Sequence, residues 1–257
     1  MPLQVIKRNS SVEDFDQDKI ARVVTAAGLK PSEGLDLAIR ISQWAQNLGK
    51  PQITTYAIRE KIIEELRKVN PTVTQFYSQY EKQKDARAHD FNLPATDGQN
   101  YFLESFKGAK GLVVVFTCNH CPYAKAAWPL FIKLAQDFKD KGVAFVGINP
   151  NDDNQYPEDS FEMMKQKVDE WQISFPYLRD ETQEVARTYG AVCTPDVFVF
   201  NQNRKLYYHG RINDNWQEPQ KVTKGELKDA IDALLMSNPP PTDQHPSMGC
   251  SIKWKTG

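Results

Sequence analysis

The feature that most constrains the fold is an apolar run at residues 111–117, GLVVVFT, which carries no charged side chain. A continuous run of this length is typical of a β-strand that is buried on both faces. A second run, VAFVGIN at 143–149, has the same character, and a helical pattern lies between the two. Strands that alternate with helices predict an α/β fold whose sheet is covered on both faces.

The rest of the chain divides into three parts. Residues 3–8 read as a strand, and Asp16 is a candidate cap for a helix that ends at Gly28. Helical patterns follow at 35–48, from Thr54 or Thr55 to 69, and from Pro71 onward. The chain then becomes polar at 84–92. We therefore predict a small, mostly helical domain at 1–86, an α/β domain at 87–238 and a Pro-rich C-terminal tail at 239–257.

Composition excludes several classes of partner. The net charge of −1 gives no global field that would attract nucleic acid or a membrane surface. No apolar run has the length of a signal peptide or approaches the roughly 20 residues that span a bilayer. We therefore expect a cytoplasmic protein. Four cysteines in 257 residues are too few for a disulfide scaffold.

The apolar run at 111–117 leads directly into the sequence CNHCPY, which contains Cys118 and Cys121. A helix begins near Pro122, so both cysteines lie at a junction between a strand and a helix N-terminus. Free amide groups and the helix dipole favour a thiolate at that position. The two-residue gap also lets one sulfur reach the other, so that a mixed disulfide can be resolved internally.

Three interpretations of this pair are open. Both cysteines are inert buried residues, or they provide half of a zinc site together with His120, or they form a redox pair. A closed zinc site needs two further ligands, usually another tight pair, whereas Cys193 and Cys250 each stand alone. We therefore favour the redox pair and predict no bound metal.

A second motif supports this choice. Thr194 and Pro195 directly precede the apolar strand DVFVF, a position that suits a proline because it lacks an amide donor. Together with FNLPATDG, VVVFTCNHCPY, VAFVGIN and YYHGRIND, this makes residues 90–237 resemble the thioredoxin-like superfamily, in its peroxiredoxin-like (AhpC/TSA, redoxin) branch. The resemblance implies a central mixed sheet flanked by helices, a cis-proline that faces the cysteines, and thiol chemistry without a tightly bound redox cofactor.

The resemblance leaves the order of the two cysteines open. In thioredoxin-like enzymes the first cysteine attacks, which assigns Cys118 as nucleophile and Cys121 as resolver. In peroxiredoxins the peroxide-reducing cysteine aligns with Cys121 and precedes a proline, but Cys118 replaces the family's threonine. The implied partners are a protein thiol or disulfide, or a peroxide, and an external thiol reductant. Cys193 is expected near the pair, and Cys250 is expected to be a small buried residue.

The N-terminal stretch VIKRNSSVEDFDQDKI places lysine and arginine side chains near a helix start, an arrangement that suits phosphate. The pattern makes residues 3–84 resemble the ATP-cone domain, which implies ATP or dATP as a regulatory ligand. The family's R-D-G turn is R-N-S here, and Ser10 lacks the conformational freedom of glycine. By position, the nucleotide-binding residues would be Val5, Lys7, Arg8, Glu13, Asp16, Lys19, Thr55 and Arg59.

Together the two resemblances imply a thiol-disulfide oxidoreductase or thiol-dependent peroxidase that is regulated by ATP or dATP. Association of copies into a homo-oligomer through the ATP-cone is one route for such regulation. The sequence contains no Walker-type phosphate loop, so nucleotide hydrolysis is not expected. The alternative is a nucleotide-responsive interaction or redox-sensor protein without turnover.

Overall fold

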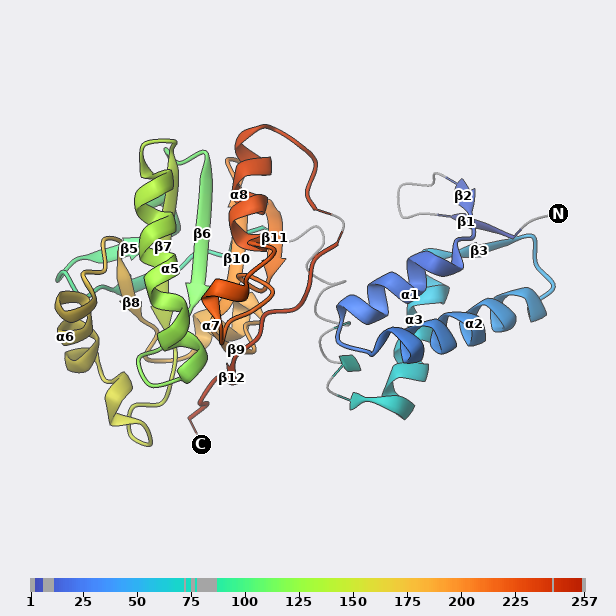
Figure 1. Ribbon diagram of the computed structural model, residues 1–257, viewed down its shortest axis with the longest axis horizontal. Helices are drawn as coiled ribbons and strands as arrows, with labels where there is room; N and C mark the ends of the chain where they lie inside the picture. The colour runs from blue at the N-terminus through green and yellow to red at the C-terminus, as the bar shows by residue number, and fades with distance from the viewer. Residues whose placement is uncertain are drawn as a thin grey trace. The chain divides into compact units, whose positions relative to one another are not determined.

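A computed structural model describes residues 3–6, 12–71, 73–74, 77, 87–241 and 243–255 (Figure 1). The chain divides into two compact units, Met1–Gln83 and Lys84–Gly257. The second unit therefore includes the Pro-rich segment from residue 239 onward.

The first unit combines a three-stranded sheet with helices that pack around two apolar clusters. The middle strand β1 pairs antiparallel with β2 and parallel with β3. The predicted cap at Asp16 is confirmed, because its carboxylate accepts the amide hydrogens of Asp18 and Lys19. Of the helix predicted from Pro71, residues 71, 73, 74 and 77 are helical, and the remainder lies outside the described residues. The elements are β1 (Gln4–Ile6), β2 (Val12–Asp14), β3 (Gln52–Thr54), α1 (Gln17–Ala26), α2 (Pro31–Asn47) and α3 (Thr55–Val69).

The second unit is built on a five-stranded sheet with the order β11-β10-β6-β7-β8. Strands β6, β7 and β8 are parallel, and β10 runs antiparallel to β6 and β11, so the predicted mixed sheet is confirmed. Its strands are β4 (Asn92–Pro94), β5 (Asn100–Phe102), β6 (Gly111–Phe116), β7 (Val143–Asn149), β8 (Tyr177–Arg179), β9 (Cys193–Thr194), β10 (Asp196–Asn201), β11 (Leu206–Gly210) and β12 (Cys250–Ser251). Its helices are α5 (Pro122–Lys139), α6 (Phe161–Trp171), α7 (Glu184–Tyr189) and α8 (Glu226–Leu235), with the short 3-10 helices η1 (Leu103–Phe106), η2 (Pro157–Asp159) and η3 (Pro219–Lys221).

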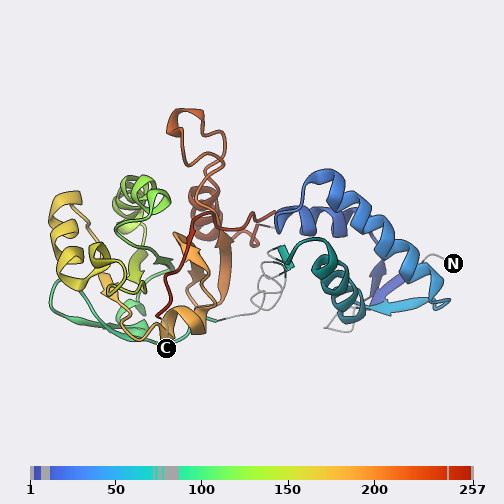
Figure 2. The same cartoon turned by 90° about the horizontal axis from the view of Figure 1, so that it is seen from below.

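Each face of this sheet has its own apolar core. Val113 and Val115 of β6 belong to the core formed with α5, α6 and α8. Leu112 and Val114 belong to the core formed with α7 and the β4–β5 hairpin. Figure 2 shows α5 and α8 on one side of the sheet, and α7 and the hairpin on the other. The continuous apolar run thus reflects burial on both faces, as in other sheets of this kind.

The C-terminal segment returns to the sheet after α8. Strand β12 pairs antiparallel with β9, with Cys250 opposite Thr194 and Ser251 opposite Cys193. The next residue, Ile252, is buried in the core that contains α7. This segment therefore lies against the strand that precedes Pro195.

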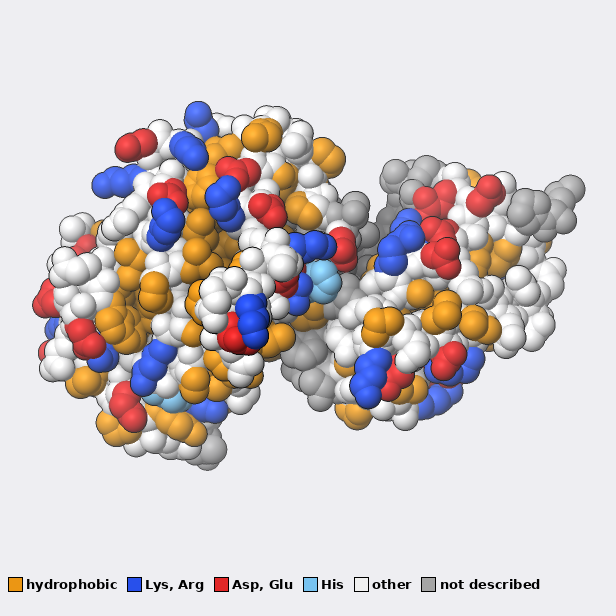
Figure 3. Space-filling view, in the orientation of Figure 1, with side chains coloured by type: hydrophobic (Ala, Val, Ile, Leu, Met, Phe, Trp, Pro, Cys, Tyr) orange, Lys and Arg blue, Asp and Glu red, His pale blue; other side chains and the backbone are white. Residues whose placement is uncertain are grey.

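The face of the molecule in Figure 3 carries both signs of charge. In Figure 3 the Lys and Arg side chains are interspersed with Asp and Glu over the visible face. Among the described helices, none combines the length and the apolar character needed to cross a membrane.

Candidate active site

The site begins where β6 ends. All six residues of β6 are buried, and the chain then passes through Cys118 and Cys121 into α5, which starts at Pro122. A proline is well suited to the first helical position because its missing amide hydrogen would have no partner there. Cys121 is the N-cap residue of α5. Both cysteines are fully buried, at 0% exposure, and both are reduced.

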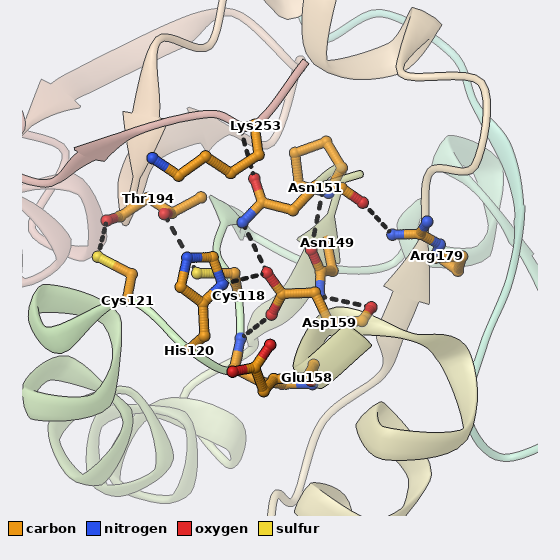
Figure 4. Close-up of polar contacts among 12 residues, drawn as sticks. Cys118, His120, Cys121, Asn149, Asn151, Glu158, Asp159, Arg179, Thr194 and Lys253 are labelled. Carbon is orange, nitrogen blue, oxygen red and sulfur yellow. Dashed lines mark hydrogen bonds and ion pairs between the residues drawn. The ribbon is translucent and has the colours of Figure 1, made fainter. Parts of the chain in front are cut away.

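Both thiols contact one residue, Thr194. The Sγ of Cys118 lies 3.2 Å from the Thr194 hydroxyl, and the Sγ of Cys121 lies 3.1 Å from the Thr194 carbonyl oxygen (Figure 4). The peptide bond between Thr194 and Pro195 is cis. The structure thus brings Cys118 and Cys121 together at Thr194, beside the cis-proline that the resemblance implies.

The surroundings of the two thiols differ. A hydrogen bond from Cys118 lowers the pKa of Cys121 to about 4, against the opposing effect of burial, and contacts with Cys250 and the amide of Ala124 add to the lowering. Burial raises the pKa of Cys118, and the hydrogen bond with Cys121 and the charge of Asp159 raise it further. These opposite directions favour the thiolate form at Cys121 and the thiol form at Cys118.

A buried carboxylate, Asp159 in η2, fixes the loop between the cysteines. Its Oδ1 accepts the amide hydrogen of Asn119 at 2.6 Å, and its Oδ2 lies 2.5 Å from Nδ1 of His120. Its Oδ2 also accepts a hydrogen from Nδ2 of Asn151 at 2.8 Å. The His120 ring stacks on Tyr156 with the centroids 4.7 Å apart. The histidine between the cysteines is thus part of a positioning network, a role that sequence reasoning missed.

The same network contains the only candidate metal group among the described residues. Cys118, His120 and Asp159 offer ligand atoms within 4.8 Å of one another. Both oxygens of Asp159 already accept hydrogen bonds, which argues that this carboxylate serves the loop. Cys121, which the zinc interpretation required, lies outside this group.

The two remaining cysteines lie close to the pair. Cys193 is buried, its Sγ lies 3.4 Å from the carbonyl oxygen of Pro195, and burial raises its pKa well above the ordinary value. Cys250 is half-buried and packs against the cluster formed by Cys118, Cys121 and Ala124. Burial and the contact with Cys121 raise the pKa of Cys250 to about 11. Cys250, which was expected to be a small buried residue, is therefore a third thiol at the site.

The predicted nucleotide residues lie in the first unit. Lys7 and Arg8, like Ser10, fall outside the described residues. The six that are described lie on β1 and β2 and at the starts of α1 and α3, namely Val5, Glu13, Asp16, Lys19, Thr55 and Arg59.

Several of these six side chains are engaged within the protein. The Lys19 ammonium lies 3.0 Å from the Glu13 carboxylate, although about half of the Lys19 side chain (53%) is exposed. Asp16 caps α1, and its carboxylate lies 3.3 Å from the Arg22 guanidinium. Arg59 pairs with Glu60 at 2.8 Å. A nucleotide would therefore compete with these pairs for the cations.

Comparisons with known proteins agree with both units. The model of the AhpC/TSA family matches residues 85–209, and the model of the ATP cone domain matches residues 3–86. A hypothetical protein, SMc02350 of Sinorhizobium meliloti, is 40% identical, and its structure covers 67% of this chain and 95% of its own with a TM-score of 0.65. An uncharacterized conserved protein of Geobacillus kaustophilus is 45% identical, with coverage of 67% and 93% and a TM-score of 0.65.

Curated relatives with a functional name also match the chain. The thiol-disulfide oxidoreductase ResA of Bacillus cereus is 24% identical over 132 residues, which is 51% of this chain and 72% of ResA. ResA of Halalkalibacterium halodurans is 27% identical over 120 residues, which is 47% of this chain and 64% of that protein. The similarity to ResA thus covers about half of the chain.

The fold and the site define a thioredoxin-like protein of the thiol-disulfide oxidoreductase and redoxin class. The chain belongs to the AhpC/TSA family through its second unit, and it carries an ATP cone domain in front of that unit. The two solved structures at 40% and 45% identity each cover 67% of this chain, so the chain belongs to one family with those two proteins.

Proposed function

We propose that the protein is a thiol-disulfide oxidoreductase in which Cys118 and Cys121 are the redox pair. The observation that carries this proposal is the convergence of both thiols on Thr194, next to the cis peptide bond of Pro195, at the start of α5. The opposite pKa shifts of the two thiols support a division of roles.

In this scheme Cys121 is the nucleophile. Its thiolate attacks one sulfur of a substrate disulfide, a mixed disulfide forms at Cys121, and the second substrate sulfur leaves as a thiolate that takes up a proton. Cys118 then loses its proton and attacks the Cys121 sulfur. The Cys118–Cys121 disulfide forms, and the remaining substrate thiolate is released. The substrate has gained two electrons, and an external thiol reductant returns the pair to its reduced state.

A peroxide is the second substrate class that fits Cys121, which precedes Pro122 as in peroxiredoxins. The thiolate would take one peroxide oxygen to become a sulfenic acid, and the other oxygen would leave as an alcohol or water. The Cys118 thiol would then condense with the sulfenic acid to give the same disulfide and one water.

The test is a thiol titration of the wild type, Cys118→Ser and Cys121→Ser, before and after a limiting amount of disulfide or peroxide. We expect the wild type to lose two thiols together, and Cys121→Ser to lose reactivity toward both oxidants. Steady-state turnover of a small disulfide or of a peroxide by the wild type, with dithiothreitol as the reductant, distinguishes an enzyme from a redox sensor. If no substrate disulfide or peroxide is turned over, the chain is better described as a nucleotide-responsive interaction protein.

We also propose that ATP or dATP binds the first unit as a regulator. The match to the ATP cone domain over residues 3–86 supports this. Calorimetric titration of the full chain with ATP, dATP and GTP tests it, with Lys19→Gln expected to weaken binding and the exposed Lys50→Gln as the matched control. Sedimentation with and without nucleotide tests association through this unit, and unchanged profiles would exclude that route.

A further inference from the structure

The C-terminal strand brings a third thiol to the redox pair. Because β12 pairs with β9, Cys250 lies opposite Thr194, the residue that both pair thiols contact. Cys250 packs against the cluster of Cys118, Cys121 and Ala124, and its side chain and backbone help to lower the pKa of Cys121. Cys121 therefore has a thiol neighbour on two sides, Cys118 from its own loop and Cys250 from the tail.

Access to solvent separates the three thiols. Cys118 and Cys121 are both 0% exposed, whereas Cys250 is half-buried. A protein thiol attacks in line with the disulfide bond and needs an open approach to the sulfur it attacks. In this conformation Cys250 is the sulfur of the three that a bulky partner reaches first.

The strand that carries Cys250 is anchored on both sides of the cysteine. Gly249 lies so close to the cis peptide that a Cβ there would come within 2.3 Å of the Thr194 carbonyl oxygen. Beyond the cysteine, Ile252 is buried at 3% exposure. The amide of Lys253 donates to Asn151 at 2.9 Å, and Asn151 in turn donates to Asp159 (Figure 4). One asparagine thus links the tail to the carboxylate that fixes the cysteine loop.

We propose that Cys250 is a third redox cysteine, which receives the disulfide from the buried pair and presents it at the surface. This inference rests on the proposed function, because that function supplies the oxidised pair. The Cys250 thiol gives up its proton and attacks the Cys121 sulfur of the Cys118–Cys121 disulfide. That bond breaks, its electron pair leaves on Cys118, and a Cys121–Cys250 disulfide forms. Cys118 takes up one proton, so the exchange needs no further oxidant or reductant.

In the second step an external protein thiol reduces the Cys121–Cys250 disulfide. A reduced protein thiol attacks the Cys250 sulfur, and Cys121 leaves as a thiolate. A low pKa makes a good leaving group, and the surroundings of Cys121 lower its pKa. A second thiol of the partner then resolves the mixed disulfide at Cys250. The partner leaves with one disulfide and the protein regains three thiols.

The first test maps disulfides in the Cys118→Ser variant of the full chain after treatment with oxidised glutathione. We expect a Cys121–Cys250 disulfide, seen by peptide mass spectrometry as the loss of two hydrogens. Adding Gly249→Ala, which pushes the tail from Thr194, should abolish that bond. A stable glutathione adduct at Cys121, or a bond between Cys250 and Cys193, would overturn the inference.

The second test compares two reductants on the oxidised protein. We expect Cys250→Ser to lose reduction by thioredoxin, a bulky protein dithiol, and to keep reduction by dithiothreitol. Ser251→Ala, on the same strand with an exposed side chain, is the control and should keep both reactions. Equal rates of reduction by thioredoxin in wild type and Cys250→Ser would refute the relay.

These outcomes separate the inference from the function on which it rests. If the wild type forms no Cys118–Cys121 disulfide and turns over no substrate, the oxidoreductase proposal itself fails. If the wild type does both and Cys118→Ser still gives no Cys121–Cys250 bond, only the role of Cys250 fails. Equal thermal unfolding of wild type and Cys250→Ser shows that the comparison concerns chemistry and not folding.

Discussion

The substitution Asp159→Asn tests whether a buried carboxylate sets both the shape and the protonation of the cysteine loop. Asp159 is 0% exposed and accepts hydrogens from Asn119 and Asn151, with His120 as its third neighbour. The substitution keeps the size of the side chain. It removes the negative charge and turns one acceptor oxygen into an NH₂ group.

The expected cost follows from these contacts. One oxygen remains for the amide of Asn119, while the new NH₂ group faces the NH₂ group of Asn151, so two buried donors oppose each other. A buried donor without a partner costs about 1–3 kcal/mol, and a hydrogen bond to a charged group contributes about 1.5–3 kcal/mol. We expect a loss of about 3 kcal/mol. At about 2–4 °C per kcal/mol for a unit of this size, the melting temperature of the second unit should fall by roughly 6–12 °C.

The same substitution should change the acidity of Cys118. The charge of Asp159 is one of the causes that raise the pKa of this thiol, so its removal should lower that pKa toward the ordinary range. Calorimetry gives the melting temperature, and pH-dependent alkylation followed by mass spectrometry gives the acidity. The neighbouring Glu158→Gln, at an exposed position, is the control. The proposed role of Asp159 is wrong if Asp159→Asn has the same melting temperature as Glu158→Gln and the same alkylation profile of Cys118 as the wild type.

Three further outcomes are expected. The pKa of Cys121 falls from an ordinary 9.0 to about 4, so its thiolate contributes stability that is fully present above pH 9.0 and is lost as the pH falls through about 4. The ultraviolet thiolate absorbance should titrate near that lower value, and Cys118→Ala should move it upward because the main hydrogen bond is gone. Ile252→Ala should lower the free energy of unfolding by about 2–5 kcal/mol because it leaves a cavity. It should also loosen the tail and so speed the alkylation of Cys121. An unchanged alkylation rate would argue that the tail does not cover Cys121. Lys19→Gln should reduce the affinity for ATP. Unchanged affinity would show that Lys19 does not belong to the nucleotide site.

The position of the cysteine pair could be predicted from the sequence because its determinants are local. An apolar run, a two-residue gap and a proline at the first helical position fix Cys118 and Cys121 at a strand-to-helix junction. The contact with Thr194 is long-range, 76 residues from Cys118. It was predictable because Pro195 precedes an apolar strand and because the order of motifs resembles a known superfamily.

The support around the pair could not be predicted, for a physical reason. Asp159 lies in a polar stretch, NPNDDNQYPEDS, whose composition is typical of a solvated loop. Its burial depends on hydrogen bonds with Asn119, 40 residues away, and with Asn151. Side chains paired at such distances leave no periodic signal. The three-residue strands β3, β4 and β5 were missed for a similar reason, because two or three alternations do not define a strand pattern.

The position of the C-terminal tail was not predicted, and this position determines how partners can reach the cysteine pair. A Pro-rich segment with few apolar residues predicts an extended chain without a core of its own, yet Ile252 is buried and β12 pairs with β9. A redox pair at 0% exposure would gain protection from unwanted oxidation but would lose contact with large partners. Either the tail must leave before each reaction, or it must carry the electrons itself. Detachment would expose Ile252 and break the bond from Lys253 to Asn151 in every cycle. Exchange between Cys121 and Cys250 requires only that two neighbouring sulfurs form a bond while the strand stays paired, which is why we favour a relay over a removable cover.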